Sequence, residues 1–288
     1  MNEEGQQYAR LAKIATRVRE HVVRMSTNGG CFLGASLSCV DILVSMYADC
    51  LNVSSDSIHD PDRDIVLLSK GHAAPALYGT LAELGYFPVA RLAAHLRTDD
   101  SIYWHPNANI PGVEFQSGSL GHLLSVGIGM ALDARLRGCE SRVFVIVGDG
   151  ELNEGSIWEA ALVAHAQELN RLFLVVDRNQ LQANIHTEDL VPLEPLAAKF
   201  EAFGWNVMSI DGHSFEELRL ALTATSTQRP MAIIANTVRG KGIPEHEGRV
   251  DKWFVKSNTE QCDTLLATLR ESGRRRPETA EFYEAGGK

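Results

Sequence analysis

The residues best placed to do chemistry in this chain are an aspartate and an asparagine that follow two short apolar runs. Asp149 lies in Gly148-Asp149-Gly150, directly after VFVIV, and Asn179 lies thirty positions further on, shortly after LFLVV. Carboxylate and amide oxygens are hard donors that suit an octahedral Mg²⁺ ion, which keeps room for phosphate oxygens and water. Gly150 has no side chain where a phosphate must approach closely. The pair therefore indicates a site for magnesium and a phosphate-bearing ligand.

The elements that must position these residues are buried strands. The apolar runs at 142–148, 171–177 and 231–238 are each bounded by polar or glycine residues, which predicts strands buried on both faces. A helical pattern at 156–169 separates the first two and gives a crossover long enough for parallel pairing. The predicted fold is α/β, a doubly wound, mostly parallel sheet flanked by helices. Because ligands bind at the carboxyl ends of such strands, Asp149 and Asn179 should meet at one edge.

Each half of this motif also has a purely structural explanation. Gly148-Asp149-Gly150 is compatible with a simple turn, and Asn179 with a helix cap. The two together, one strand-helix-strand unit apart, favour the ligand site. The helix predicted after Gly150 adds unpaired backbone N–H groups, which attract anionic oxygens.

The rest of the chain is consistent with one domain. Apolar residues recur at helical spacing from about Tyr8 to Met25 and again from near Ser38 to Leu51, which predicts two helices. At 288 residues and 44% hydrophobic composition, the chain can bury one substantial core. We assign residues 1–272 to this domain and predict that the charged, glycine-ended stretch 273–288 is a mobile tail.

Charge and cysteine content exclude several classes of function. A formal net charge of −10 argues against a nucleic-acid partner, which requires a basic face. The five cysteines form no C-x-x-C pair, so neither a disulfide framework nor a zinc site is predicted. The sequence shows no signal-peptide core and no uninterrupted apolar run long enough to cross a membrane. We therefore expect a cytoplasmic protein without a membrane partner.

One long segment resembles a known cofactor motif. Residues 148–182 read GDGELNEGSIWEAALVAHAQELNRLFLVVDRNQLQ and resemble the thiamine diphosphate motif, which begins G-D-G and closes on an asparagine after the next strand. The transketolase version of that motif adds an acidic residue and then W-E-A, which Glu154 and Trp158-Glu159-Ala160 match. The resemblance implies that thiamine diphosphate is the cofactor.

The same resemblance assigns roles to individual residues. It implies that Asp149, Asn179 and the main-chain carbonyl of Leu181 hold Mg²⁺, with Ca²⁺ or Mn²⁺ as substitutes. Gly148, Gly150 and Asn179 are then expected to border the diphosphate. Glu154 is expected near the cofactor and the subunit interface, where it would help to position a catalytic carboxylate of the partner. The structural alternative for Glu154 is an acidic residue favoured in a first helical turn.

Further matches follow the family's order over nearly the whole chain. Ser69-Lys70-Gly71-His72 resembles the segment whose histidine lies beside the diphosphate and the reacting carbon, and His105 in WHPN resembles the histidine that meets the donor sugar's terminal hydroxyl. The run from Gly118 through Leu120 to Gly121, with the small-residue helix at Val126, resembles the loop whose backbone touches the aminopyrimidine ring. The resemblance thus implies that His72, His105 and Glu154 are catalytic. The remaining matches are Phe203-Gly204-Trp205, Asp211-Gly212-His213 and Gly240-Lys241-Gly242.

The sequence departs from the transketolase pattern at several polar positions. Phe32 stands where the glycine-rich loop of the family carries a histidine, and Phe254, behind Trp253, replaces another. His246 is a possible substitute for the second histidine, and His122 stands where a glutamine is common. A phenylalanine can neither donate a hydrogen bond to a sugar hydroxyl nor relay its proton. We therefore expect a drier pocket and an unusual acceptor.

The predicted partner is a second polypeptide. Complete transketolases continue with a pyrimidine-binding domain, whose glutamate activates the cofactor ring, and a third domain, whereas 288 residues accommodate only the first domain. We therefore interpret the chain as the N-terminal subunit of a split transketolase that forms an α₂β₂ assembly with a separate pyrimidine-domain subunit.

Three functional hypotheses remain open from the sequence. The leading one is transfer of a two-carbon ketol unit from a ketose phosphate to an acceptor. The alternative is a subunit that acts on a 2-oxo acid, like a dehydrogenase E1 component or deoxyxylulose-phosphate synthase, which the two phenylalanines would fit. W-E-A and the His105 segment favour the first. The third hypothesis, a catalytically idle homologue that only binds a partner, does not explain why Asp149, Asn179, Glu154 and His72 are all retained.

Overall fold

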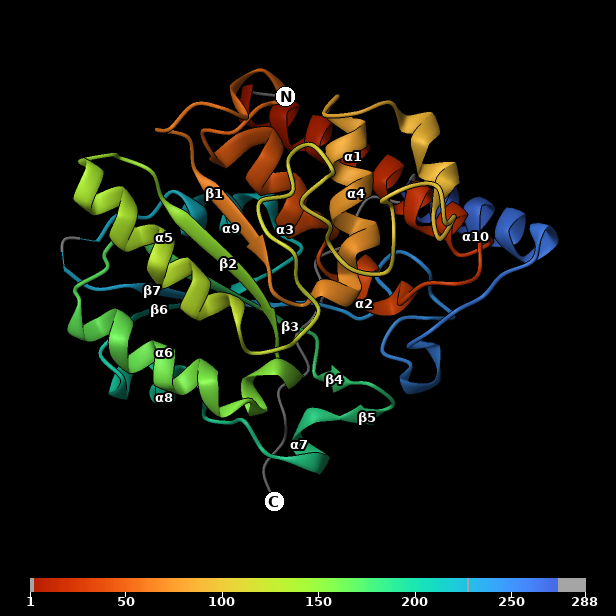
Figure 1. The fold of residues 1–288 in the computed structure, drawn as a ribbon. Coiled ribbons are helices and arrows are strands. Elements are labelled where there is room, and N and C mark those ends of the chain that lie inside the picture. Colours follow the sequence, from red (N-terminus) through yellow and green to blue (C-terminus); the bar gives the residue numbers. More distant parts are fainter. Residues whose placement is uncertain (1–2, 227, 274–288) are drawn as a thin grey trace.

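A five-stranded parallel sheet forms the centre of the structure, a computed structural model that describes residues 3–226 and 228–273 (Figure 1). The strand order is β1-β2-β3-β7-β6, and every pair of neighbours is parallel. The strands are β1 (Ile65–Leu68), β2 (Val143–Gly148), β3 (Leu172–Arg178), β6 (Asn206–Asp211) and β7 (Met231–Asn236). The predicted doubly wound α/β fold is confirmed, and the three predicted strands are β2, β3 and β7.

The central strands supply side chains to two separate hydrophobic cores. In β2, Phe144 and Ile146 enter one core, whereas Val143, Val145 and Val147 enter the other. Successive side chains of a strand point to opposite faces, so a strand covered on both sides needs an apolar residue at every position. This requirement explains the continuous apolar runs in the sequence.

Helices cover both faces of the sheet (Figure 1). The layer on the first core contains α1 (Glu3–Met25), α2 (Leu33–Ser38), α3 (Val40–Ser45), α4 (Ala74–Glu83), α9 (Phe215–Leu222) and α10 (Thr259–Ser272). The layer on the second core contains α5 (Leu123–Arg137), α6 (Gly155–Ala166) and α8 (Leu196–Ala202). Gly127 lets α5 approach β2 closely, because a Cβ there would lie 2.7 Å from Val145 Cγ2.

Short elements complete the described part of the chain. They are a π-helical turn η1 (Met46–Cys50), the helical turn α7 (Thr187–Leu190), and the 3₁₀ turns η2 (Ser55–Ser57), η3 (Gly71–Ala73), η4 (Val89–Ala94), η5 (Gly150–Asn153) and η6 (Val250–Lys252). β4 (Leu181–Gln182) and β5 (Ile185–His186) pair as an antiparallel hairpin beyond the end of β3.

Two predicted boundaries need comment. The helix predicted from near Ser38 to Leu51 is confirmed, because α3 begins at Val40 and continues as η1 to Cys50. The short helix α2 before it was not predicted; it ends at Ser38, and Cys39, at φ −96° and ψ 7°, breaks the helical geometry before α3 begins. The Ser38 hydroxyl donates to Ala35 O and to Asp177, which favours the break. The predicted tail, 273–288, lies outside the described residues apart from Gly273. In the described part of the chain, no helix has the length and apolar character needed to span a membrane.

Candidate active site

The ends of β2 and β3 bring the two halves of the first motif together. Gly148 is in register with Asp177, so Asp149 and Asn179 emerge at the same edge of the sheet. Asp149 Oδ1 accepts from the Gly150 N–H at 2.8 Å, and its Oδ2 accepts from the Gln180 N–H at 2.5 Å. Asn179 Oδ1 accepts from the Leu181 N–H at 3.2 Å. Backbone N–H groups thus hold these oxygens in place, and the bond from Gln180 to Asp149 joins the two turns.

Asp149 is a buried carboxylate with incomplete charge compensation. Burial and the nearby charge of Asp177 raise its pKa to about 6, against the opposing effects of the Arg178 guanidinium and the backbone N–H donors. Arg178 Nη1 lies 3.1 Å from Asp149 Oδ2. The same guanidinium also pairs through Nη2 with Glu188 and Glu194, so its charge is shared among three carboxylates. Additional positive charge beside Asp149 would therefore be stabilising, as a bound divalent cation provides.

The donor set fits a hard cation. No group of three or more His, Cys, Asp or Glu side chains converges on a metal position within residues 3–226 and 228–273. The candidate ligands are instead one carboxylate, the amide of Asn179 and the carbonyl of Leu181, which begins β4. Such an oxygen set suits Mg²⁺, which retains water and takes phosphate oxygens as further ligands.

A buried guanidinium with an unpartnered N–H lies near these residues and suits an anion site. Arg239 is 2% exposed, and its Nη1 donates to Ala183 O at 2.6 Å, whereas its Nε has no partner among the described residues. Burial lowers its pKa to about 10, although the charges of Asp149 and Asp177 oppose the shift. A Cβ at Gly150 would lie 2.4 Å from Cβ of Gln182, whose Oε1 is likewise unpartnered in the described structure. Only glycine fits at position 150, because the Gln182 side chain occupies the space that a Cβ would need.

Glu151 is a functional candidate that the sequence analysis did not identify. Its side chain is buried and accepts hydrogen bonds from the Ser69 hydroxyl, from the Gly121 N–H at 2.9 Å and from the Gly148 N–H at 3.2 Å. Burial raises its pKa, while these donors stabilise the carboxylate. Glu151 therefore ties together three loops to which the sequence assigned cofactor contacts. Its only signal in the sequence is a charged residue directly after the glycine-aspartate-glycine motif.

A third buried carboxylate, Asp177, lies at the end of β3, in register with Gly148. It pairs with Lys70, and both side chains are almost completely buried. Asp177 also accepts from Ser38 Oγ at 2.6 Å and from the Thr237 hydroxyl, while Lys70 Nζ donates to Ala35 O at 3.0 Å. This network joins the segment before His72 to α2 and to the ends of β3 and β7.

His72 and His105 are brought close by two glycines. A Cβ at Gly71 would lie 2.9 Å from the Gly118 N, and a Cβ at Gly118, where φ is +138°, would lie 2.9 Å from His105 Cδ2. Burial, assisted by the charges of Lys70 and His105, lowers the pKa of His72 to about 3, and burial also lowers that of His105. Both imidazoles are therefore neutral near pH 7, and each can donate through one ring nitrogen and accept through the other.

Glu154 lies at the open side of the site. It is exposed and occupies the N-cap position of α6 without a side-chain cap bond. A Cβ at Gly121 would lie 2.7 Å from Cβ of Glu154, and Ser156 Oγ donates to Gly121 O at 2.9 Å. The loop that contains Gly118 and Leu120 therefore packs against the start of α6, and the Glu154 carboxylate remains available to another molecule.

Aromatic side chains border the histidines. The ring of Phe32 lies 5.7 Å from that of His72 and 5.3 Å from that of Phe254, measured between centroids. Both positions of the predicted departure therefore lie together in space. His246, the possible substitute, is buried and lines a pocket of about 530 Å³ together with Phe254. His122 is exposed immediately before α5.

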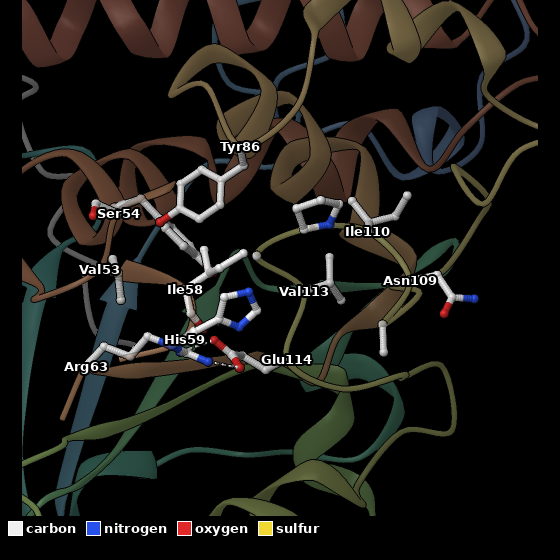
Figure 2. Close-up of a pocket in the computed structure, with 14 residues that line it drawn as sticks. Val53, Ser54, Ile58, His59, Arg63, Tyr86, Asn109, Ile110, Val113 and Glu114 are labelled. Atoms are coloured by element: carbon white, nitrogen blue, oxygen red, sulfur yellow. Dashed lines mark hydrogen bonds and ion pairs between the residues drawn. The ribbon is translucent and has the colours of Figure 1, made fainter. Parts of the chain in front are cut away.

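A separate pocket of about 270 Å³ lies between segments 53–63 and 108–114 (Figure 2). None of the predicted site residues lines it. Arg63 in its wall is neutralised by two hydrogen bonds to Glu114, one of 2.8 Å. The Tyr86 ring packs directly against Gly112, because a Cβ at position 112 would lie 2.6 Å from the tyrosine Cδ1. We interpret this region as support for the segment that leads to Gly118.

Comparison with known proteins gives consistent matches. The family model described as transketolase, thiamine diphosphate binding domain, matches residues 13–253. An apulose-4-phosphate transketolase subunit of Actinobacillus succinogenes is 39% identical over 275 residues, which cover 94% of this chain and 100% of that protein. The 6-deoxy-6-sulfo-D-fructose transketolase subunit SqwG of a Clostridium species is 36% identical, covering 84% of this chain and 89% of that one.

A solved structure matches the fold over nearly the whole chain. The transketolase of Campylobacter jejuni superimposes with a TM-score of 0.83 at 26% identity and covers 95% of this chain. The match takes in only 43% of that protein, so this chain spans less than half the length of the solved enzyme.

Proposed function

Because this chain belongs to the family of transketolase thiamine diphosphate binding domains, we propose that it is the N-terminal subunit of a two-component transketolase. The reaction is transfer of a two-carbon ketol unit from a ketose phosphate to an acceptor. The relatives named as subunits match over most of their own length, which supports a separate partner for this chain.

The site residues divide into those that hold the cofactor and those that face the substrate. We assign Asp149, Asn179 and the Leu181 carbonyl to Mg²⁺, and the turn from Gly148 to Gly150 to the diphosphate. When bound, thiamine diphosphate supplies a nucleophilic carbon and an electron sink for the two-carbon unit. The backbone at Gly118 and Leu120 is assigned to the pyrimidine ring.

The two histidines are assigned to the donor sugar. His72 follows Gly71, which packs against Gly118, and Gly118 in turn packs against the His105 ring; both imidazoles are neutral at pH 7. Such rings can bind hydroxyl groups as either donor or acceptor and can move a proton at a hydroxyl oxygen. They would orient the sugar and assist cleavage of the bond next to its carbonyl.

The partner subunit is assigned to the exposed side of α6. Glu154 is exposed there, and Leu162 and Val163 of the same helix are 56% and 46% exposed. Apolar side chains at such exposure are favoured where another protein covers them. We propose an α₂β₂ assembly in which Glu154 meets a catalytic carboxylate of the pyrimidine-domain subunit. An interface of more than about 2,000 Å² is expected for such an obligate complex.

The observation that carries this proposal is the meeting of Asp149 and Asn179 at one sheet edge, with the buried Arg239, whose Nε has no partner among the described residues, close enough to interact with Asp149. The test is an Asp149→Ala substitution in the assembled enzyme, with thiamine diphosphate affinity measured by calorimetry at several Mg²⁺ concentrations. Loss of a metal ligand should weaken metal-supported binding at least about 100-fold. Asp263→Ala, an exposed position on α10, is the matched control and should bind normally. Unchanged affinity and metal dependence in Asp149→Ala would refute the assignment.

A further inference from the structure

Four aromatic side chains form a continuous surface beside the candidate histidines. We call Phe32, Trp104, Trp253 and Phe254 the aromatic wall. The centroid of Phe32 lies 5.0 Å from Trp253, 5.3 Å from Phe254 and 6.4 Å from Trp104, and Trp104 lies 6.1 Å from Phe254. These residues come from three segments that are distant in the sequence, so the fold assembles the wall.

The wall lies at the substrate side of the site. Phe32 presents an edge-on contact to His72, with centroids 5.7 Å apart, and Trp104 directly precedes His105. Trp104 and Phe254 are each 38% exposed, and Tyr103, which stacks on Trp104 at 5.9 Å, is 51% exposed. A ligand that reaches both histidines would therefore meet these rings.

Backbone contacts hold the wall in place without a ligand. Cys31 and Val255 form an antiparallel bridge with N–H to O distances of 3.0 and 2.9 Å. A Cβ at Gly30, where φ is +99°, would lie 2.6 Å from the Phe254 ring. Gly34 also packs closely against the segment that leads to Trp253 and Phe254, because a Cβ at this position would lie 2.9 Å from the Lys252 carbonyl oxygen. Phe32 and Phe254 are therefore pre-organised, which limits the entropy lost when a ligand binds.

The chemistry of the wall favours an apolar ligand group. A sugar phosphate carries a hydroxyl on nearly every carbon, and each hydroxyl that leaves water needs a new hydrogen-bond partner. Phe32 and Phe254 provide none, and the two tryptophans provide only indole N–H donors. Aromatic or aliphatic groups lose no hydrogen bonds when they contact these rings, and aromatic groups gain edge-to-face and stacking contacts.

Building on the proposed transketolase activity, we propose that the acceptor is an aldehyde whose carbonyl carbon bears an aromatic or aliphatic group, and that the aromatic wall binds this group. The donor ketose phosphate loses its two-carbon unit by cleavage between C2 and C3; the C3 hydroxyl gives up its proton and becomes the carbonyl group of the aldose phosphate that leaves. A new carbon–carbon bond forms at the acceptor carbonyl, whose oxygen takes up a proton and becomes a hydroxyl. One such bond breaks and one forms, so the step needs no oxidant or reductant.

The test compares acceptors in the enzyme assembled with its partner subunit, under a saturating concentration of ketose phosphate. Benzaldehyde and propanal represent the proposed class, and erythrose 4-phosphate represents sugar acceptors. We expect kcat/KM to favour benzaldehyde over erythrose 4-phosphate by at least tenfold.

Two variants test whether the aromatic wall causes this preference. Phe32→His, which introduces a hydrogen-bonding ring of similar size, should shift the ratio of the two kcat/KM values at least tenfold towards the sugar. Phe254→Ala, at a half-exposed position, should lower kcat/KM for benzaldehyde more than for propanal and gives a second test if Phe32→His does not fold.

A control and a donor measurement separate the possible failures. Val89→His places the same imidazole at an exposed apolar position on η4 and should leave the ratio unchanged. Release of aldose phosphate from the donor, followed without a second substrate, reports the proposed function alone. If the donor is cleaved but erythrose 4-phosphate is the better acceptor, the acceptor proposal is wrong while the transketolase assignment stands. If no donor is cleaved, the proposed function itself is wrong.

The other occupant to test is the partner subunit. Oxidative labelling of Trp104, read by mass spectrometry, should persist in the assembled enzyme and fall when benzaldehyde is added. Protection of Trp104 by the partner alone, with no further effect of benzaldehyde, would assign the wall to the interface and overturn the proposal.

Discussion

At the scale of single residues, three buried carboxylates at the sheet edge have different sets of partners. Asp149 has one shared guanidinium and backbone N–H groups, Glu151 accepts from neutral donors, and Asp177 has a lysine of its own. A buried carboxylate requires either a cation or several hydrogen bonds. Asp149 is thus the one suited to take up an added cation, whereas Glu151 and Asp177 are structural supports of the site.

Glu151 allows a sharp test of this division. In Glu151→Gln, one carboxylate oxygen becomes an NH₂ group, which must face at least one of the present donors, Ser69 Oγ or the N–H groups of Gly121 and Gly148. We expect a loss of about 1–3 kcal/mol in the free energy of unfolding, because a buried donor is left unsatisfied. Weaker thiamine diphosphate binding in the assembled enzyme should accompany it.

Urea denaturation of the purified chain measures the stability effect, and calorimetry measures the binding effect. Glu260→Gln, an exposed position in the first turn of α10, is the control and should match the wild type in both. A fully stable Glu151→Gln with normal cofactor affinity would contradict the role of Glu151 as the tie between the three loops.

The lowered pKa of His72 gives a prediction about pH. With a pKa near 3, the imidazole stays neutral from about pH 4 upward, so protonation of His72 cannot produce a limb near pH 6.5 in the rate profile. His72→Asn should therefore lower kcat/KM by at least about 100-fold, as expected for a group that moves a proton, without changing the shape of the profile between pH 5 and 8. His59→Asn, at an exposed position, is the control for rate. An ionisation between pH 6 and 7 that disappears only in His72→Asn would show that the assignment is wrong.

At the scale of elements, the strands that could be predicted from the sequence are those buried on both faces of the sheet. β2, β3 and β7 were predictable because each is covered on both faces and therefore consists of apolar residues. β1 was missed because it has only four residues, and β6 because it is an edge strand that includes Asn206 and Ser209. The break at Cys39 and the three-loop contacts of Glu151 depend on residues far away in the sequence, which local periodicity does not report.

The Lys70–Asp177 pair tests whether the elements around the site depend on one buried contact. Lys70→Met removes the cation and leaves Asp177 buried beside Ser38 and Thr237 without a charge partner. An uncompensated buried charge should cost about 3–5 kcal/mol of unfolding free energy. Chemical denaturation near neutral pH measures this loss.

The matched control breaks an ion pair that is open to solvent. Arg97→Met separates Arg97 from Asp99, whose side chains are 64% and 66% exposed, and should leave stability unchanged within error. Equal effects of Lys70→Met and Arg97→Met would mean that the buried pair does not hold the segment before His72 in place.

At the scale of the whole molecule, the proposed cofactor site combines buried residues at the sheet edge with exposed residues at the start of α6. The proposed metal ligands Asp149 and Asn179 emerge at a single sheet edge, whereas Glu154 and the apolar residues Leu162 and Val163 of α6 are exposed, and we propose that a second protein covers them. The sequence predicted this edge from the spacing of Asp149 and Asn179. Phe32 and Phe254 were each identified in the sequence as departures from the family pattern. Their contacts with each other and with Trp104 and Trp253 depend on the fold and could not be predicted from the sequence.

The most direct test of the account is to assay the purified chain with thiamine diphosphate, Mg²⁺ and a ketose phosphate, with and without the pyrimidine-domain subunit. The chain alone should release or transfer no two-carbon unit, because the proposed mechanism needs a partner carboxylate beside Glu154. Activity should appear when the partner is added and should reach its maximum at a one-to-one ratio of the two polypeptides. Multiple turnovers by this chain alone would contradict the two-component transketolase.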